Sequence, residues 1–149
     1  MTLGQGHIGH VPRLLSILWA FTRATPWLPQ VRSRLTDLYM MCLVIRRGWV
    51  RIAFHGGLPL GFIAREGCRI HALYVHPKAR GRGVGRALLR DAKADTGHLD
   101  LYVLQRNRAA WAFYAHEGFA EAGRSVGTDN DEKMPDIRMI WYAREGREQ

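Results

Sequence analysis

The sequence predicts a single domain of the α/β (α+β) class, in which a mixed β-sheet carries helices on both faces. Three features indicate this class. Pro12–Thr22 has apolar residues at helical spacing, and His55-Gly56-Gly57 separates two strand-like segments. A glycine-rich turn joins the strand-like Ile70–Val75 to the helix-like Ala87–Ala94. A chain of 149 residues can bury one sizeable core, so we expect one domain over residues 1–149.

The N-terminal third is predicted to be helical. Its first helix, Pro12–Thr22, ends before Pro26-Trp27-Leu28-Pro29, because proline interrupts a helix. A second helix is expected over Val31–Arg46. Its stretch Leu38–Ile45 is apolar on all sides, so a buried strand stays open as an alternative. Thr2–His10 is too rich in glycine and histidine to predict a strand there.

The rest of the chain is predicted to alternate strands and helices. Two strands flank the glycine pair, which is a typical hairpin loop. A strand, a helix, a strand, a helix and two closing strands follow. The expected segments are strands Trp49–His55, Leu58–Arg65 and Arg69–Val75, a helix ending near Asp95, strand Leu99–Leu104, helix Arg108–His116, and strands Gly118–Val126 and Asp136–Ala143 on either side of the polar, acidic loop Gly127–Pro135.

The composition is that of a soluble globular protein, with 47% apolar and 23% charged residues. No segment reaches the ~20 apolar residues of a membrane-spanning helix, so we expect a cytoplasmic protein without a membrane partner. Cys42 and Cys68 lack metal-ligand spacing and the histidines form no i, i+4 pairs, so no metal site is expected. The net charge of +9 is consistent with an anionic ligand, a nucleic acid or a solvated basic surface.

The run Arg80-Gly81-Arg82-Gly83-Val84-Gly85-Arg86 is predicted to bind a phosphate or pyrophosphate. Glycines at a helix start let backbone N–H groups approach an anion, and the helix dipole and the arginines add positive charge. A nucleoside-triphosphate loop does not fit, because it requires a Gly-Lys pair and the chain has none. The dinucleotide pattern G-x-G-x-x-G does not fit either, because Arg86 replaces its third glycine.

A third phosphate-binding pattern, (Q/R)-x-x-G-x-(G/A), does fit this run. Arg80, Gly83 and Gly85 fill it, directly after Leu73-Tyr74-Val75-His76-Pro77. A second block, N-x-x-A-x-x-F-Y-x-x-x-G-F, spans Asn107–Phe119. In this order the two blocks resemble the GNAT superfamily of N-acetyltransferases. The resemblance covers residues 49–142 as a cofactor-binding core, whereas residues 1–48 diverge and are expected to form acceptor-side helices.

The resemblance implies a GNAT-like mixed, mostly antiparallel sheet of six to seven strands. It also implies an enzyme that moves an acetyl group from acetyl-CoA to a primary amine of an unidentified small molecule or protein. Direct transfer in a ternary complex is expected, because no cysteine stands beside a histidine base. The cofactor-binding residues that the resemblance implies are Leu73, Tyr74, Val75, Arg80, Gly81, Arg82, Gly83, Val84, Gly85, Arg86 and Asn107.

Tyr114 is the candidate general acid. It matches the tyrosine that protonates the departing coenzyme A thiolate in this family. A phenol, with an ordinary pKa near 10, is still protonated at neutral pH and can deliver that proton. A purely structural aromatic residue beside Phe113 and Phe119 is the alternative.

His71 is the candidate general base. Strand alternation places it on the face of Leu73 and Val75, and imidazole titrates in a range that suits base catalysis. A strand histidine with a structural hydrogen bond is the alternative. Glu66 is a second candidate, and Arg69 stands near the place where some family members carry a glutamate on this strand.

Two other functions stay open. A non-catalytic acyl-CoA sensor would keep the phosphate loop and use the apolar Leu38–Ile45 as a partner surface, including one for a homodimer. A basic nucleic-acid-binding module would account for the net charge, although the arginines are scattered and no aromatic stacking platform accompanies them.

The acceptor side offers two further groups of residues. The acidic side chains would attract a cationic acceptor or form a solvated loop. The tryptophans would line an acceptor pocket or belong to the core. The acidic residues are Asp129, Asp131 and Glu132, and the tryptophans are Trp19, Trp27 and Trp49.

Overall fold

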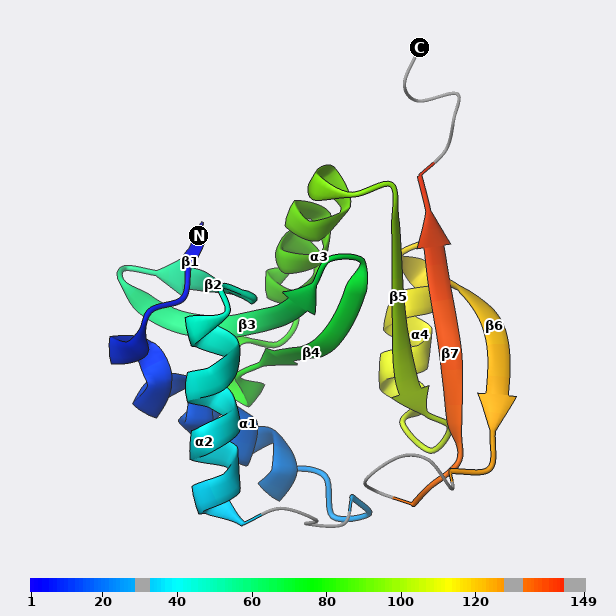
Figure 1. Cartoon of the computed structure of the whole chain (residues 1–149), viewed down its shortest axis with the longest axis horizontal. Helices are drawn as coiled ribbons and strands as arrows, with labels where there is room; N and C mark the ends of the chain where they lie inside the picture. Colours follow the sequence, from blue (N-terminus) through cyan, green and yellow to red (C-terminus); the bar gives the residue numbers. More distant parts are fainter. Residues whose placement is uncertain (29–32, 128–132, 144–149) are drawn as a thin grey trace.

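The computed structural model describes residues 1–28, 33–127 and 133–143. Within these residues the chain forms one seven-stranded sheet in the order β1-β2-β3-β4-β5-β7-β6, with helices on both faces (Figure 1). Only the β4–β5 pair is parallel, and the other neighbouring strands are antiparallel. The predicted fold class, a mixed and mostly antiparallel sheet, is therefore confirmed. None of the helices in these residues is long and apolar enough to cross a membrane.

The strands and helices follow the predicted order closely. The strands after the first are β2 (Val50–His55), β3 (Leu58–Glu66), β4 (Arg69–Val75), β5 (His98–Leu104), β6 (Ala120–Ser125) and β7 (Asp136–Tyr142). The helices are α1 (Val11–Arg23), α2 (Arg34–Arg46), α3 (Val84–Asp95) and α4 (Arg108–His116), with short 3-10 turns at Ile8–His10 and Pro77–Ala79.

The structure contains a first strand, β1 (Thr2–Gln5), that we did not predict from the sequence. β1 pairs antiparallel with β2, and the Gly6 N–H donates to the Val50 carbonyl over 2.9 Å. A Cβ on Gly4 would lie 3.3 Å from the Phe54 ring, and one on Gly6 would lie 3.0 Å from Val50. The glycines therefore let this segment lie close against β2. Strand propensity, which describes residues one at a time, does not predict such an approach.

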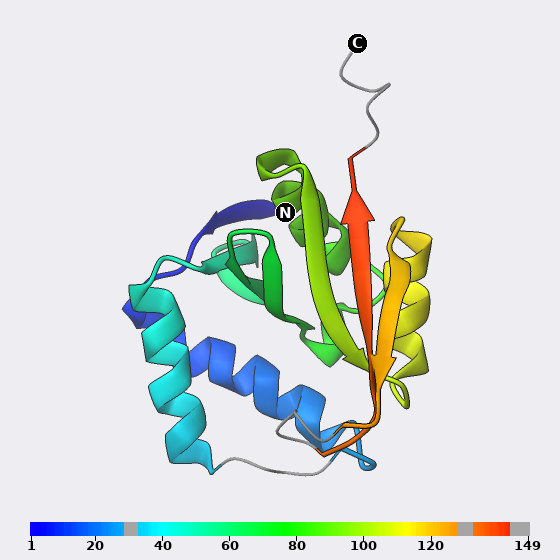
Figure 2. The ribbon, with the colours of Figure 1, turned by 45° about the vertical axis from the view of Figure 1, so that its right-hand side comes forward.

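Helices α1 and α2 cover one face of the sheet, while α3 and α4 cover the other (Figures 1 and 2). The apolar Leu38–Ile45 is helical, which excludes the buried strand. Met41 and Ile45 are buried in the core that α2 shares with α1, whereas Tyr39 is exposed. Ser33 caps α2 by accepting a hydrogen bond from the Thr36 N–H over 3.2 Å. The predicted start at Val31 lies outside the described residues.

Strands β4 and β5 separate soon after they meet. They pair only at Arg69 and Asp100, and from there their C-terminal ends run apart (Figure 1). Two neighbouring parallel strands that lose their ladder leave backbone N–H and C=O groups without sheet partners. The open end of this wedge is the main irregularity of the sheet, and the candidate site is built around it.

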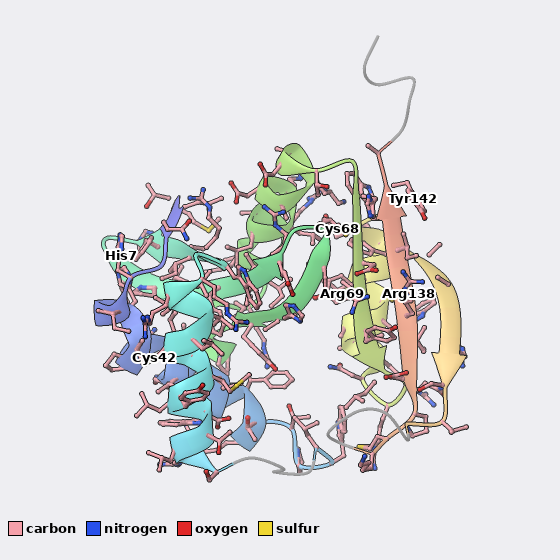
Figure 3. All side chains as sticks on the ribbon, viewed as in Figure 1. His7, Cys42, Cys68, Arg69, Arg138 and Tyr142 are labelled. Atoms are coloured by element: carbon pink, nitrogen blue, oxygen red, sulfur yellow. The ribbon has the colours of Figure 1, made fainter. Side chains whose placement is uncertain are left out.

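A buried carboxylate holds the closed end of the wedge. Asp100 is only 6% exposed, and its side chain accepts hydrogen bonds from Arg69 of β4 and from Arg138 of β7, the latter over 2.9 Å (Figure 3). Its N–H also donates to the Cys68 carbonyl over 2.9 Å. The hydrogen bond from Arg69 holds the pKa of Asp100 below its ordinary value. This cluster ties β4, β5 and β7 together where the sheet divides.

Asp100→Asn is expected to lower the free energy of unfolding by about 2 kcal/mol at neutral pH, because the arginines lose a buried counter-charge. The loss is not larger because the two arginines are partly solvated. A carboxylate with a lowered pKa stabilises the fold above its unfolded pKa, and this contribution is lost as pH falls through the folded pKa. The difference from wild type should thus shrink below about pH 4. Urea unfolding of both proteins, at neutral pH and below about pH 4, measures this difference in the free energy of unfolding. The control Asp95→Asn removes an ion pair with Arg65 whose carboxylate side chain is 69% exposed, and should cost less than about 0.5 kcal/mol.

Candidate active site

A cleft of about 830 Å³ lies between the separated ends of β4 and β5. The glycine-rich loop and the start of α3 line one part of it. Residues from the last turn of α1 and from the segment that follows, between positions 21 and 28, line another part. The structure brings nearly all predicted site residues to this cleft. Those that line it are His71, Leu73, Tyr74, Val75, Arg80, Gly81, Gly83, Val84, Gly85, Arg86, Asn107 and Tyr114, whereas Arg82 does not.

The glycine-rich loop leaves the N-terminus of α3 open. Gly81 and Gly83 have φ values of +77° and +78°, a left-handed conformation that glycine adopts without a steric penalty. A Cβ at either position would have nothing within 4 Å. Gly83 is the N-cap residue of α3, and no side chain among the described residues caps this end. The first N–H groups of α3 and the helix dipole therefore offer a site for an anion.

Gly85 has a different role, since it allows α3 to pack on α4. A Cβ there would lie 3.3 Å from Cζ of Phe113. Arg86 also lies beside an acidic side chain, because its Nε is 3.5 Å from Oε2 of Glu117, whose side chain is buried. The positive charge that the loop offers an anion comes mainly from Arg80, with Arg82 alongside it outside the cleft lining.

Tyr114 lies near the C-terminal end of α4 and lines the cleft. It is 8% exposed and packs edge-on against Phe113 and Phe119, with ring centroids 5.1 and 5.3 Å away. Burial raises the pKa of its phenol. A neutral phenol that lines the cleft can act as a proton donor. Asn107 lines the cleft as well, but its side chain also caps α4 by accepting from the Ala110 N–H over 3.2 Å.

His71 lines the cleft together with Leu73 and Val75, at an irregularity of β4 that the sequence did not indicate. The pairing of β3 with β4 shifts so that Arg65 faces Ile70 and Ala64 faces Ala72, which leaves His71 as the extra residue of a β-bulge. Alternation fails across the bulge, because Ile70 shares a core cluster with Leu73 and Val75 despite its odd spacing from Leu73. The bulge instead aims His71 at the cleft, and its ring stacks on Trp49, with centroids 5.4 Å apart.

The acidic and aromatic acceptor-side candidates have different outcomes. Trp27 lines the cleft, whereas Trp19 lies outside it and donates from Nε1 to Asp37 over 2.9 Å. Trp49 stacks on His71 and lines a separate shallow groove. The acidic residues Asp129, Asp131 and Glu132 lie outside the described residues. No group of three or more His, Cys, Asp or Glu side chains in the described part of the chain is placed to hold a metal ion.

Comparison with known proteins identifies this arrangement. Residues 42–121 match the family model described as an acetyltransferase (GNAT) domain, which is more than half of the chain. The chain belongs to the GNAT acetyltransferase family. It is an acyltransferase that moves an acetyl group from acetyl-CoA to an amine, which confirms the activity, the cosubstrate and the family that the sequence predicted.

Two curated relatives and one solved structure show how far the similarity extends. The peptidyl-lysine N-acetyltransferase YiaC of Escherichia coli is 37% identical, over 86% of this chain and 84% of its own length. Peptidyl-lysine N-acetyltransferase YjaB of the same organism is 31% identical, over 75% and 76%. The solution structure of apo YjaB matches with a TM-score of 0.78 and 23% identity, covering 97% of this chain and all of YjaB.

The cleft of this acetyltransferase also includes residues that the sequence motifs did not indicate. Phe21 and Leu28 line it from the α1 side and Tyr102 from β5. The guanidinium of Arg106 lies 5.6 Å from the centroid of the Trp27 ring, so the segment after α1 meets the turn after β5 (Figure 2). Tyr102 could have been found by alternation within its strand, because its neighbours Leu101 and Val103 are core residues.

Proposed function

We propose that this acetyltransferase modifies the ε-amine of lysine side chains in polypeptides. Both curated relatives carry that activity in their names, and the acceptor end of the cleft supports it. Phe21, Trp27, Leu28 and Tyr102 form an apolar and aromatic lining that suits the four-carbon stem of a lysine. One cleft that is lined by the start of α3, by Tyr114 and by these apolar side chains is the observation that carries the proposal.

We assign residues 49–142 to acetyl-CoA and residues 1–48 to the acceptor. In this assignment Leu73, Tyr74 and Val75 offer backbone groups to the pantetheine arm, because β4 has lost its ladder with β5 there. Asn107 contacts the same arm. The loop residues Arg80–Arg86 hold the pyrophosphate at the N-terminus of α3, where glycines with positive φ keep the approach open.

Transfer is direct in this proposal. The neutral amine nitrogen bonds to the acetyl carbon, the carbon–sulfur bond breaks, and the thiolate takes a proton from Tyr114 while His71 accepts the proton of the amine. Neither cysteine lines the cleft: Cys42 lies on α2 and Cys68 in the β3–β4 turn, far apart (Figure 3). A cysteine acyl-enzyme therefore has no support, and a ternary complex of protein, acetyl-CoA and amine is the proposed route.

Three matched peptides test the acceptor class. One carries a single internal lysine and a blocked N-terminus, the second replaces that lysine by arginine, and the third lacks lysine but has a free α-amine. Release of coenzyme A with a mass gain of one acetyl group is expected for the first peptide alone. Acetylation of the third peptide in preference to the first would overturn the lysine proposal and would indicate an N-terminal acetyltransferase.

Three further expectations stay predictions. A homodimer through Leu38–Ile45 is supported by the exposure of Leu38, Tyr39 and Met40 on α2, and a cytoplasmic location is untested. Nucleic-acid binding has less support, since many arginines lie in ion pairs with acidic side chains. These arginines are Arg51, Arg65, Arg69, Arg86, Arg124 and Arg138.

A further inference from the structure

We propose that Glu66 is a positioning residue for His71, so that the two side chains form one proton-accepting pair. The inference rests on the proposed function, because it takes His71 as the base for the acceptor amine. Nε2 of His71 lies 2.9 Å from Oε1 of Glu66. An ionised carboxylate only accepts hydrogen bonds, so this contact places the proton of the neutral imidazole on Nε2. The lone pair then lies on Nδ1, which has no hydrogen-bond partner among the described residues.

Three separate elements build this pair. β3 ends at Glu66, the β3–β4 turn follows, and the bulge in β4 then turns His71 out of the regular ladder. Trp49, just before β2, covers the imidazole, with 20° between the two ring planes. The Trp49 carbonyl also accepts a hydrogen bond from the Arg65 N–H over 2.9 Å, next to Glu66. The ring is therefore held on its edge by Glu66 and on its face by Trp49, while it borders the cleft.

The charged neighbours of the pair leave Glu66 as the carboxylate in contact with His71. The Arg65 guanidinium donates to the Gly67 carbonyl and to a carboxylate of α3, so it is engaged away from Glu66. Arg69, two positions before His71, belongs to the Asp100 cluster. Arg47 lies over the Trp49 ring, 5.0 Å from its centroid. Glu66 is thus the group that can balance a positive charge on His71.

The pair would act at the step in which the amine loses its proton. As the nitrogen bonds to the acetyl carbon, Nδ1 takes the N–H proton, and the imidazolium that forms is stabilised by the carboxylate of Glu66. The His71 side chain is 42% exposed and that of Glu66 is 57% exposed, so water can carry the proton away afterwards. No other reactant is needed, because acetyl-CoA and the amine supply every atom that moves.

Glu66→Gln tests the pair, since it keeps the size of the side chain and removes its charge. Turnover of the lysine peptide should fall about tenfold near pH 7, with an unchanged Kd for acetyl-CoA. The control Glu121→Gln removes a carboxylate that bonds to Trp111 and Arg124 outside the cleft, and should change none of these quantities.

Nitrogen NMR of the His71 ring provides a readout that does not depend on turnover. The wild type should show the Nε2–H tautomer, and Glu66→Gln a mixture of both tautomers. A Glu66→Gln protein with wild-type turnover and the wild-type tautomer would overturn the proposal. A wild type that acetylates no lysine peptide would contradict the proposed function instead, and the tautomer measurement would still decide whether Glu66 orients His71.

Discussion

Gly83→Glu is expected to raise the Kd for acetyl-CoA by about 100-fold or more, which corresponds to roughly 3 kcal/mol of lost charge-assisted hydrogen bonding. Gly83 is the N-cap residue of α3, where the backbone N–H groups and the helix dipole favour an anion. A glutamate side chain would put a negative charge and its own bulk into that space. Calorimetric titration with acetyl-CoA and with free coenzyme A measures the loss.

A matched control separates loss of the anion site from backbone strain. Gly57, in the β2–β3 hairpin, has a φ of +81° against +78° for Gly83, and a Cβ at either position would meet nothing within 4 Å. Gly57→Glu therefore introduces the same residue at the same backbone conformation, far from the proposed cofactor loop. It should bind acetyl-CoA like the wild type. Equal losses in both variants would show that strain, and not the phosphate site, governs binding.

The shape of the glycine-rich end of the cleft could be predicted because its determinants are local. Glycines with positive φ, a helix that starts at once and a strand that ends at Val75 all lie within one stretch of sequence. The same holds for α4, whose N-cap Asn107 and buried Tyr114 are spaced along a single helix. Where a few neighbouring residues fix both the backbone and the chemistry, a motif describes the structure well.

The parts that escaped prediction depend on pairing between distant segments. β1 forms because Gly4 and Gly6 let the chain lie against β2, and the strand propensity of these residues does not predict this pairing. The bulge at His71 follows from the register of β3 against β4, so alternation along β4 alone could not locate it. The Glu66–His71 contact depends on the same shift. Asp100 is a similar case, since its two arginines come from different strands.

The contact between the segment after α1 and the turn after β5 could not be predicted from a motif either. Trp27 and Arg106 meet across the open end of the wedge, and they are separated by most of the chain. In the proposed assignment, residues 1–48 shape the acceptor end of the cleft rather than bind a fixed chemical group, which accounts for their weak sequence signal. An acceptor site of this kind tolerates many side chains of similar size and polarity, whereas a pyrophosphate site does not.

Tyr114→Phe is expected to lower the turnover of the lysine peptide by about 100-fold, within the range for loss of a general acid. The KM for acetyl-CoA should stay within about threefold of the wild-type value, because the ring keeps its contacts with Phe113 and Phe119. Steady-state kinetics that follow coenzyme A release give both parameters. The control Tyr142→Phe removes a hydroxyl from an exposed tyrosine of β7 that does not line the cleft, and should keep wild-type turnover.

The pH dependence gives a second test of the same residue. Because burial raises the pKa of the Tyr114 phenol above its ordinary value, the phenol stays protonated throughout the neutral and mildly basic range. Wild-type turnover should therefore show no basic limb below about pH 9, since an acid with an ordinary pKa near 10 would already begin to lose its proton there. If turnover in Tyr114→Phe matches the wild type at every pH, water or another group protonates the thiolate, and Tyr114 is only a packing residue of α4.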